Sequence, residues 1–303
     1  MPHNRKVTKA VITAAGYGTR FLPITKAIQK EMLPIIDKPI LHYIVEECVM
    51  SGIKDIIIVT KYGTSSSVED YFDSIIEYEE FLRKSRKYKE LDQLKWITKM
   101  ANIAYVRQNK ELPYGNASPL IAAKNFIGKE SFVLAWGDDI VLSKVPAVKQ
   151  VKLAYERNKC SAVLAVQEVS NEEIQRIGMV SLKKGSKNQV EGVLEKPEKH
   201  QITSNLAEYG RFVLSPVIFK FLSVDKKGKG NELWLIDAIN EMCKKHKVIA
   251  QPIDGKWYTT GDPLRYLKTT FAVAMRRDDI KDDLIAYLRE EIKAIDTMKT
   301  IKD

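Results

Sequence analysis

Short apolar runs alternate with helical patterns along the first half of the chain, and this alternation is typical of an α/β fold. The runs are rich in β-branched residues and bounded by glycine or charged residues, as expected of strands buried on both faces. The expected strands are Lys9–Ala14, Asp55–Thr60, Ile103–Gln108 and Phe132–Trp136. Between the first two, residues 39–50 place five apolar side chains on one face of a helix that Gly52 should end. This order predicts a right-handed crossover and a mainly parallel sheet.

After residue 140 the pattern is less regular. Further strands are expected at Ser161–Val169, Met179–Leu182, Val190–Leu194 and Tyr209–Leu214, some of them antiparallel. Helices are expected over Asn231–Lys245 and from Pro263 to the end. The apolar stripe from Leu284 to Ile295 can pack either on the protein's own core or on another subunit, and for such a stripe we expect the protein's own core. The pattern thus predicts an α/β protein with a Rossmann-like, mixed but mostly parallel sheet flanked by helices. We expect one domain over residues 1–262 and a C-terminal helical appendage over 263–303.

The composition agrees with a globular protein in a reducing compartment. Of 303 residues, 45% are hydrophobic and 29% are charged, which excludes wholesale disorder. No uncharged apolar run approaches the roughly 20 residues needed to cross a bilayer, and the N-terminus lacks the pattern of a signal peptide. The three cysteines are far apart and fit neither a disulfide framework nor a zinc cluster. We therefore expect a cytoplasmic protein without a membrane partner.

The formal net charge is +10, because 49 Lys and Arg outnumber 39 Asp and Glu. Such an excess suits anionic partners, which are nucleic acids, a membrane surface or phosphorylated small molecules. The lysines are spread along the chain, and the densest basic block, residues 83–89, is flanked by acidic residues and predicts a solvated helix face. Charge alone therefore does not identify the partner.

The most informative segment directly follows the first expected strand and reads Ala14-Ala15-Gly16-Tyr17-Gly18-Thr19-Arg20. Glycines in such a loop let backbone N–H groups approach a phosphate. Phe21 stands where a dinucleotide-binding loop needs its third glycine, and the Gly-Lys-Ser/Thr ending of a Walker loop is missing. Lys26 and Lys30 follow, and together with Arg20 they can hold a triphosphate. The alternative is an ordinary strand-to-helix turn with surface lysines. Because the prominent basic residues belong to this loop, we expect a nucleotide and no nucleic acid as partner.

An ordered set of motifs extends from this loop along the chain. The first is AAGYGTRFLPITKAIQKEMLPIIDKPILHYIVEE, from Ala14 to Glu47. It is followed by Gln108 ahead of a glycine loop, Trp136-Gly137-Asp138-Asp139, Glu195-Lys196-Pro197, Ser204-Asn205-Leu206-Ala207, Gly210-Arg211-Phe212 and Asn231-Glu232-Leu233. In this order the motifs resemble those of the sugar-phosphate nucleotidyltransferases, most closely the uridylyltransferases of bacteria. The resemblance covers about residues 7–270. It implies the fold of the nucleotide-diphospho-sugar transferases and the formation of UDP-glucose and pyrophosphate from UTP and glucose 1-phosphate.

The resemblance also implies which residues bind the nucleotide. The implied triphosphate-binding residues are Ala14, Ala15, Gly16, Gly18 and Thr19, and the implied catalytic cations are Arg20 and Lys30. Gln108 and Gly115 are implied in recognising the base, since an amide can pair with the donor and acceptor edge of uracil. Asn116 stands where uridylyltransferases usually have a histidine, so a side-chain contact from that histidine is not expected here.

Mg²⁺ is the implied cofactor, and Asp138 is its implied ligand and a catalytic residue. Asp138 follows an expected strand, where open α/β sheets build ligand sites, and Mg²⁺ prefers one or two carboxylates with phosphate oxygens and water. Without the glycine loop, Gly-Asp-Asp would be read as a common turn. Thr259 replaces an aspartate that is a second metal ligand in many relatives. Asp262 is then the nearest spare carboxylate for that role.

On the sugar side, the resemblance implies Gly178, Glu195 and Lys196 as the residues that bind the sugar phosphate. A carboxylate can accept hydrogen bonds from two vicinal hydroxyls, the lysine can balance the phosphate, and the glycine leaves room for the hexose. Two other functions stay open. One is a nucleotidyltransferase for another base or sugar, such as a thymidylyltransferase. The other is a nucleotide-sugar-binding regulator that has lost catalysis. The resemblance also implies a homo-oligomer, either a dimer or a tetramer.

Overall fold

The computed structural model describes residues 6–63, 65–170, 174, 177–195, 197–202, 204–225 and 227–300. The first four strands form where the pattern predicts them, with the third shifted by one residue. Strands β1 (Lys9–Ala14), β4 (Asp55–Thr60), β5 (Asn102–Arg107) and β6 (Phe132–Trp136) lie parallel in the order β6-β1-β4-β5. Successive side chains of β1 are fully buried on both faces, which is why its run is continuously apolar.

The second half of the chain adds antiparallel strands to this sheet, as predicted. Strand β11 (Leu206–Leu214) pairs antiparallel with β6, with β8 (Ala162–Glu168) and with β9 (Gly178–Leu182). Beyond β9 lies β10 (Val190–Glu195), and β12 (Val248–Pro252) runs parallel to β8. In the described part of the chain these strands form one nine-stranded mixed sheet.

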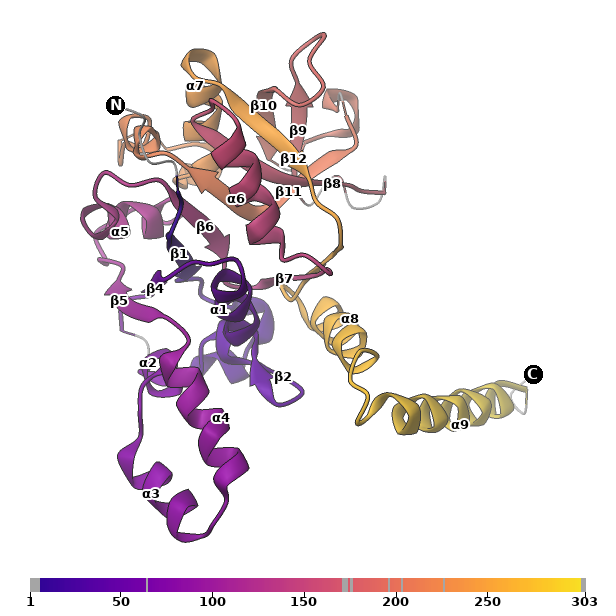
Figure 1. Cartoon of the computed structure of the whole chain (residues 1–303). Helices are drawn as coiled ribbons and strands as arrows, with labels where there is room; N and C mark the ends of the chain where they lie inside the picture. Colours follow the sequence, from indigo (N-terminus) through magenta and orange to yellow (C-terminus); the bar gives the residue numbers. More distant parts are fainter. Residues whose placement is uncertain are drawn as a thin grey trace.

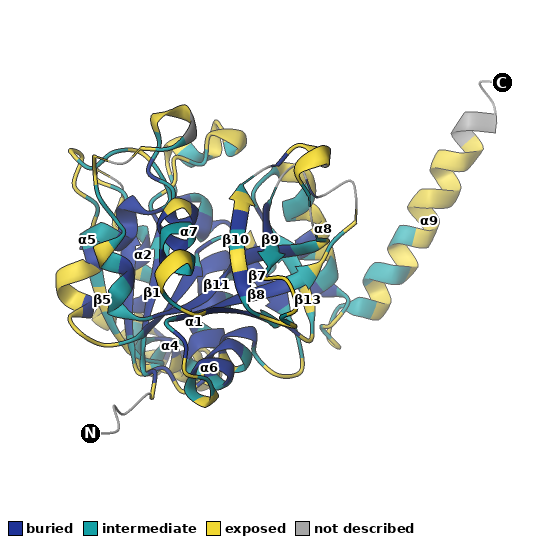
Figure 2. Cartoon of the chain, turned by 90° about the horizontal axis from the view of Figure 1, so that it is seen from above, coloured by how far each residue is buried: buried dark blue, intermediate teal, exposed yellow. Residues whose placement is uncertain are grey.

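Helices cover the two faces of the sheet and enclose two apolar cores (Figure 2). Helices α1 (Ile40–Met50) and α6 (Ala147–Arg157) pack on one face. Helices α5 (Ser118–Ile127) and α7 (Leu235–Lys245) pack on the other. Helix α7 begins four residues later than predicted, because Gly230 and Asn231 adopt left-handed backbone angles (φ 72° and 61°).

Several short elements were not predicted. Strands β2 (Pro34–Ile35) and β3 (Lys38–Pro39) form a hairpin, and β7 (Asp139–Leu142) pairs with β13 (Lys256–Thr259) beside the main sheet. Helices α2 (Ser67–Phe72), α3 (Ile76–Lys84) and α4 (Tyr88–Lys99) form a protrusion between β4 and β5 (Figure 1). The basic block 83–89 is exposed there, as predicted, although a turn divides it between α3 and α4.

The C-terminal region contains one packed helix and one projecting helix. Helix α8 (Pro263–Ala274) packs against β13, and the Thr269 hydroxyl donates to the carbonyl of Thr259. Helix α9 (Lys281–Thr300) points away from the body (Figures 1 and 2). Ile292 and Ile295 are 57% and 50% exposed, so the prediction that this stripe packs on the protein's own core is wrong. The chain turns at Arg277, which pairs with Asp37 and Asp279 before α9 begins. None of the described helices is long and apolar enough to cross a membrane.

Candidate active site

The glycine loop after β1 lies directly over Lys30. Gly18 has a left-handed backbone (φ 63°), and its carbonyl accepts a hydrogen bond from the Thr25 hydroxyl. The chain then returns beneath the loop, where Lys30 begins a short 3₁₀ turn. A Cβ at position 16 would lie 3.2 Å from Cε of Lys30. Gly16 therefore lets the backbone of the loop and the ammonium of Lys30 approach one another closely.

Lys30 forms an ion pair with Asp138 at the carboxyl end of β6. Its Nζ lies 2.5 Å from Oδ2 of Asp138 and 3.8 Å from Oε1 of Glu31. Burial alone would raise the pKa of Asp138, but the Lys30 ammonium outweighs burial and holds that pKa below its usual value. Burial alone would likewise lower the pKa of Lys30, and Asp138 reverses that shift. Both groups are therefore charged at neutral pH.

Two buried carboxyls flank this ion pair, and neither of their roles was predicted. Glu31 is buried, and its Oε2 has no hydrogen-bond partner in the part of the chain that the structure describes. Burial raises the pKa of Glu31 to about 7, although Lys30 opposes the shift. Burial, and then the charge of Asp138, raise the pKa of Asp139 to about 7, and a hydrogen bond with the Thr259 side chain opposes that shift. The site therefore places three carboxyl groups around one lysine, and burial favours the protonated form of two of them.

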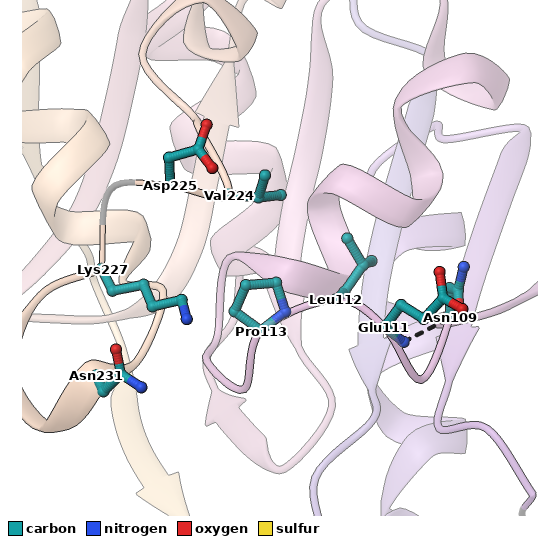
Figure 3. A pocket seen from close by; sticks show the side chains of 8 residues that line it. All are labelled: Asn109, Glu111, Leu112, Pro113, Val224, Asp225, Lys227 and Asn231. Atoms are coloured by element: carbon teal, nitrogen blue, oxygen red, sulfur yellow. Dashed lines mark hydrogen bonds between the residues drawn. The ribbon is translucent and has the colours of Figure 1, made fainter.

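A cavity of about 290 Å³ opens above the ion pair. It brings together six of the predicted site residues, namely Ala15, Gly16, Lys30, Gln108, Gly115 and Asp138. Its wall also includes Glu31, Tyr114, Trp136 and Trp234. A larger hollow of about 770 Å³ lies between residues 109–113 and 224–231 (Figure 3). Its lining includes none of the predicted site residues, so the smaller cavity is the candidate site.

The loop that follows β5 forms one wall of the cavity and is held by backbone contacts. Gly115 has φ 145°, and a Cβ there would lie 2.2 Å from the carbonyl oxygen of Leu233. This close packing, which sequence reasoning missed, requires glycine whether or not a nucleotide is bound. Asn116 is structural as well, because its Oδ1 accepts a hydrogen bond from the Leu235 N–H at the start of α7 (2.8 Å).

Arg20 and Asp262 are not among the residues that line the cavity. A guanidinium nitrogen of Arg20 donates to the carbonyl of Gly261 (3.1 Å), and the side chain is exposed. Asp262 is the N-cap of α8, and its two oxygens accept from the backbone and the guanidinium of Arg265, each at 3.0 Å. Burial opposes the shift, but these bonds lower the pKa of Asp262. Its carboxylate is thus engaged by the helix and by Arg265.

The predicted sugar-side residues lie on two neighbouring strands. Gly178 of β9 is directly opposite Glu195 of β10. Lys196 lies outside the described residues. Sequence reasoning missed Glu208 of β11, whose Oε1 lies 2.8 Å from the position that a Cβ on Gly178 would take. The signal was present, since Glu208 is a charged residue within a strand that is otherwise almost wholly buried.

A buried arginine supports the turn that carries Asp138. Arg211 is fully buried and donates to Oε2 of Glu47 through two nitrogens (2.8 and 3.1 Å). It also donates to the carbonyls of Asp139 (2.7 Å) and Trp136 (3.3 Å), on either side of Gly137-Asp138. The signals were an arginine within an apolar strand and Glu47 on the buried stripe of α1. The ion pair of Arg211 with Glu47 therefore holds the turn at Gly137-Asp138 in place.

The donor set suits a hard divalent cation that is shared with a phosphate ligand. The Lys30 ammonium on Asp138 shows that a cation can sit against this carboxylate. Carboxylate oxygens are the donors that Mg²⁺ prefers. Among the described residues, however, no three His, Cys, Asp or Glu side chains form a ready metal cluster. The site therefore fits an ion whose remaining ligands come from phosphate and water.

Comparison with known proteins agrees with this geometry. A family model described as nucleotidyl transferase matches residues 9–275. The UTP–glucose-1-phosphate uridylyltransferase of Staphylococcus epidermidis is 44% identical over 288 residues, which are 94% of this chain and 99% of that protein. A solved structure of UDP-glucose pyrophosphorylase complexed with UDP-glucose is 33% identical, with a TM-score of 0.77, and the match covers 89% of this chain and 100% of that one. The UTP-bound enzyme of Acinetobacter baumannii is 28% identical, with a TM-score of 0.84 over 94% of this chain and 99% of that one. The predicted fold and class of enzyme are confirmed. The chain belongs to the nucleotidyl transferase family.

Proposed function

We propose that this protein transfers a uridylyl group from UTP to glucose 1-phosphate, and so forms UDP-glucose and pyrophosphate. The observation that carries the proposal is the cavity in which Lys30 and Asp138 lie beneath Gly16, with Gln108 and Gly115 on its wall. The relatives at 43–44% identity, which match 94% of this chain, are uridylyltransferases for these substrates.

The nucleotide would enter this cavity with its triphosphate along the glycine loop. The backbone of Ala14, Ala15, Gly16, Gly18 and Thr19 would bind phosphate oxygens, as expected of successive N–H groups after a parallel strand. The amide of Gln108 and the backbone at Gly115 would bind the uracil base. Arg20 would reach the outer phosphates from the rim, because its side chain is exposed and its one described hydrogen bond is to a neutral carbonyl.

The reaction needs charge neutralisation rather than a nucleophilic side chain. An anionic oxygen of glucose 1-phosphate attacks the α-phosphorus of UTP in line, the bond from that phosphorus to the bridging oxygen breaks, and pyrophosphate leaves with the bonding electron pair. Because the attacking oxygen is already ionised, no general base is required. Lys30 would stabilise the charge that develops on the phosphate oxygens, as a preorganised cation in a partly buried site.

Asp138 would hold the Mg²⁺ ion, and Asp139 lies beside it with its side chain opposite Thr259. The bound ion supplies positive charge that offsets repulsion between the two anionic substrates. Since Asp138 now pairs with Lys30, metal binding at this carboxylate would free the ammonium for the phosphates. Asp262 is a weak candidate for a second ligand, because Arg265 engages both of its oxygens.

The hexose would lie toward β9 and β10. Glu195 would accept hydrogen bonds from sugar hydroxyls, Gly178 would leave space beside it, and Lys196 would balance the sugar phosphate. We further propose residues 1–262 as the catalytic domain and residues 263–303 as a helical appendage. The exposed stripe of α9 would then be covered by another copy of the chain in a homo-oligomer.

A pyrophosphate-release screen tests the substrates. It crosses UTP, dTTP, CTP, ATP and GTP with the 1-phosphates of glucose, galactose and N-acetylglucosamine. UTP with glucose 1-phosphate should give the highest kcat/KM. A preference for dTTP would make the protein a thymidylyltransferase. Binding of UDP-glucose without turnover of any pair would make it a regulator.

A further inference from the structure

Three residues form a row across neighbouring strands of the antiparallel part of the sheet. Gly178 of β9 pairs with Glu195 of β10 on one side. On the other side Met179 pairs with Ala207, so that the next row places Glu208 of β11 beside Gly178. Paired residues of adjacent strands share one face, so both glutamates flank a position without a side chain. The result is a notch with a carboxyl on either side, and Cδ1 of Ile236 also approaches it, 2.9 Å from the position that a Cβ on Gly178 would take.

Glu208 is held in this notch with one oxygen left unpaired. The residue is 6% exposed, and its Oε2 accepts a hydrogen bond from the Gly210 N–H (3.1 Å). Its Oε1 is directed over Gly178, 2.8 Å from the position that a Cβ would take, and it has no hydrogen-bond partner among the described residues. No described lysine or arginine forms an ion pair with it. Burying a carboxyl in this way is costly unless a ligand supplies the missing donor.

The notch adjoins the candidate nucleotide cavity. The ring of Trp136, which lines the cavity, lies against Gly210, where a Cβ would be only 1.8 Å from the indole. The same Gly210 donates to Glu208. Asp139 is also close enough to influence the charge of Glu208. A sugar phosphate that reaches the α-phosphate near Asp138 therefore has Glu208 within its neighbourhood.

We propose that Glu208 is a second sugar-binding carboxyl, which recognises hydroxyl groups of the hexose 1-phosphate together with Glu195 across Gly178. The inference rests on the proposed uridylyltransferase function. Hydroxyl groups are the donors that the unpaired Oε1 lacks, and a site built to pair with a hydroxyl discriminates strongly against a substrate without it. Glu208 is thus a specificity residue for the sugar and takes no part in binding UTP.

The test uses the full-length protein with saturating UTP and the four monodeoxy analogues of glucose 1-phosphate at positions 2, 3, 4 and 6. Wild type should lose about 10- to 100-fold in kcat/KM with the analogue that lacks the hydroxyl bound by Glu208, because a buried hydrogen bond is lost and the carboxyl oxygen is left unpaired. In Glu208→Ala this penalty should fall to within about threefold, while penalties at the other positions persist. Glu208→Gln should retain more activity, because its amide oxygen can still accept. Exposed Glu191 on β10 gives the matched control, Glu191→Ala.

The readouts separate this inference from the proposed function. Calorimetry should give the same UTP affinity in wild type and in all three variants, which also shows that they are folded. If Glu208→Ala keeps every wild-type penalty, Glu208 is structural and the inference is overturned. If wild type binds UDP-glucose without turnover, the proposed function fails. Weaker binding of UDP-glucose to Glu208→Ala would then still support the sugar contact, and unchanged binding would overturn it.

Discussion

In the proposed nucleotide half of the site a lysine ammonium lies 2.5 Å from a carboxylate, whereas in the proposed sugar half two glutamates flank a glycine. Both halves bury carboxyl groups, but the pKa of the buried carboxyl shifts downward in one half and upward in the other. Lys30 holds the pKa of Asp138 below its usual value, while burial and then the charge of Glu195 raise the pKa of Glu208 to about 8. One half is preorganised for anions that need a cation. The other is suited to a neutral ligand that donates hydrogen bonds.

Removing the central carboxylate should have the largest effect. Asp138→Asn should reduce kcat by at least about 10³-fold, because it removes the proposed metal ligand and the partner of Lys30. The measurement is the rate across a Mg²⁺ titration, with Mg²⁺ binding followed by calorimetry. Asp139→Asn is the matched control and should be milder, since its side chain lies opposite Thr259. A normal Mg²⁺ response in Asp138→Asn would disprove the metal assignment.

Removing the buried ion pair between Arg211 and Glu47, which supports the turn that carries Asp138, should destabilise the fold. Arg211→Met leaves Glu47 buried without its ion-pair partner, with the Val148 N–H still donating to Oε1, and should lower the free energy of unfolding by about 3–5 kcal/mol in urea titrations. Arg277→Met, at an exposed ion pair, is the control and should leave the unfolding midpoint unchanged. Equal stability of the two variants would mean that the buried pair contributes nothing.

Neutralising the cations tests the nucleotide half by itself. Lys30→Ala and Arg20→Ala should each reduce kcat/KM by roughly 10²–10³, because each removes one charge contact to the phosphates. Arg20→Ala should cost little stability, whereas Lys30→Ala also removes the ion-pair partner of Asp138 and should lower the free energy of unfolding. Lys26 is exposed, and Lys26→Ala serves as the control with near-normal activity. Of these three cations only Lys30 lines the cavity. Normal activity in Arg20→Ala alone would therefore indicate that the triphosphate binds within the cavity and does not reach Arg20.

The sugar half should make stability depend on pH. The pKa of Glu208 is raised to about 8, so folded protein retains its proton where the unfolded chain releases it, and this stabilisation is lost as pH rises from about 4.5 through 8. Glu208→Gln should therefore gain stability relative to wild type over that range, by about 3–5 kcal/mol, since each pKa unit corresponds to about 1.4 kcal/mol. The nearby carboxyls Glu195 and Asp139 are present in both proteins, so the comparison isolates Glu208. Urea titrations at several pH values measure the difference in the free energy of unfolding between Glu208→Gln and wild type. A difference that does not change with pH would contradict the raised pKa of Glu208.

The smallest effect on stability is expected far from both halves. Ile292→Ser with Ile295→Ser should change the free energy of unfolding by less than about 0.5 kcal/mol, because α9 projects from the body. Sedimentation of the same variant should show a lower mass than wild type if the stripe is covered by another copy. Ile12→Ala in β1 is the contrasting core variant and should cost about 2–5 kcal/mol.

Residues close in sequence were predicted well because local patterns specify them. The bounds of β1, β4 and β6 follow from continuous apolar runs, and the glycine loop follows from its position after β1. The motif order was sufficient to identify the family and its fold. These features depend on the backbone and on neighbours within a few residues, so the amino-acid sequence by itself determines them.

Contacts between distant segments were decided only by the tertiary structure. Gly115 fits against Leu233, Glu47 pairs with Arg211, and Glu208 reaches over Gly178, although each pair is far apart in the chain. Likewise, the stripe on α9 is visible in the sequence, but the turn at Arg277 decides that it faces away from the core. A periodic pattern shows which face of an element is apolar, and packing alone decides what that face meets, because burial and pairing depend on where the rest of the chain lies.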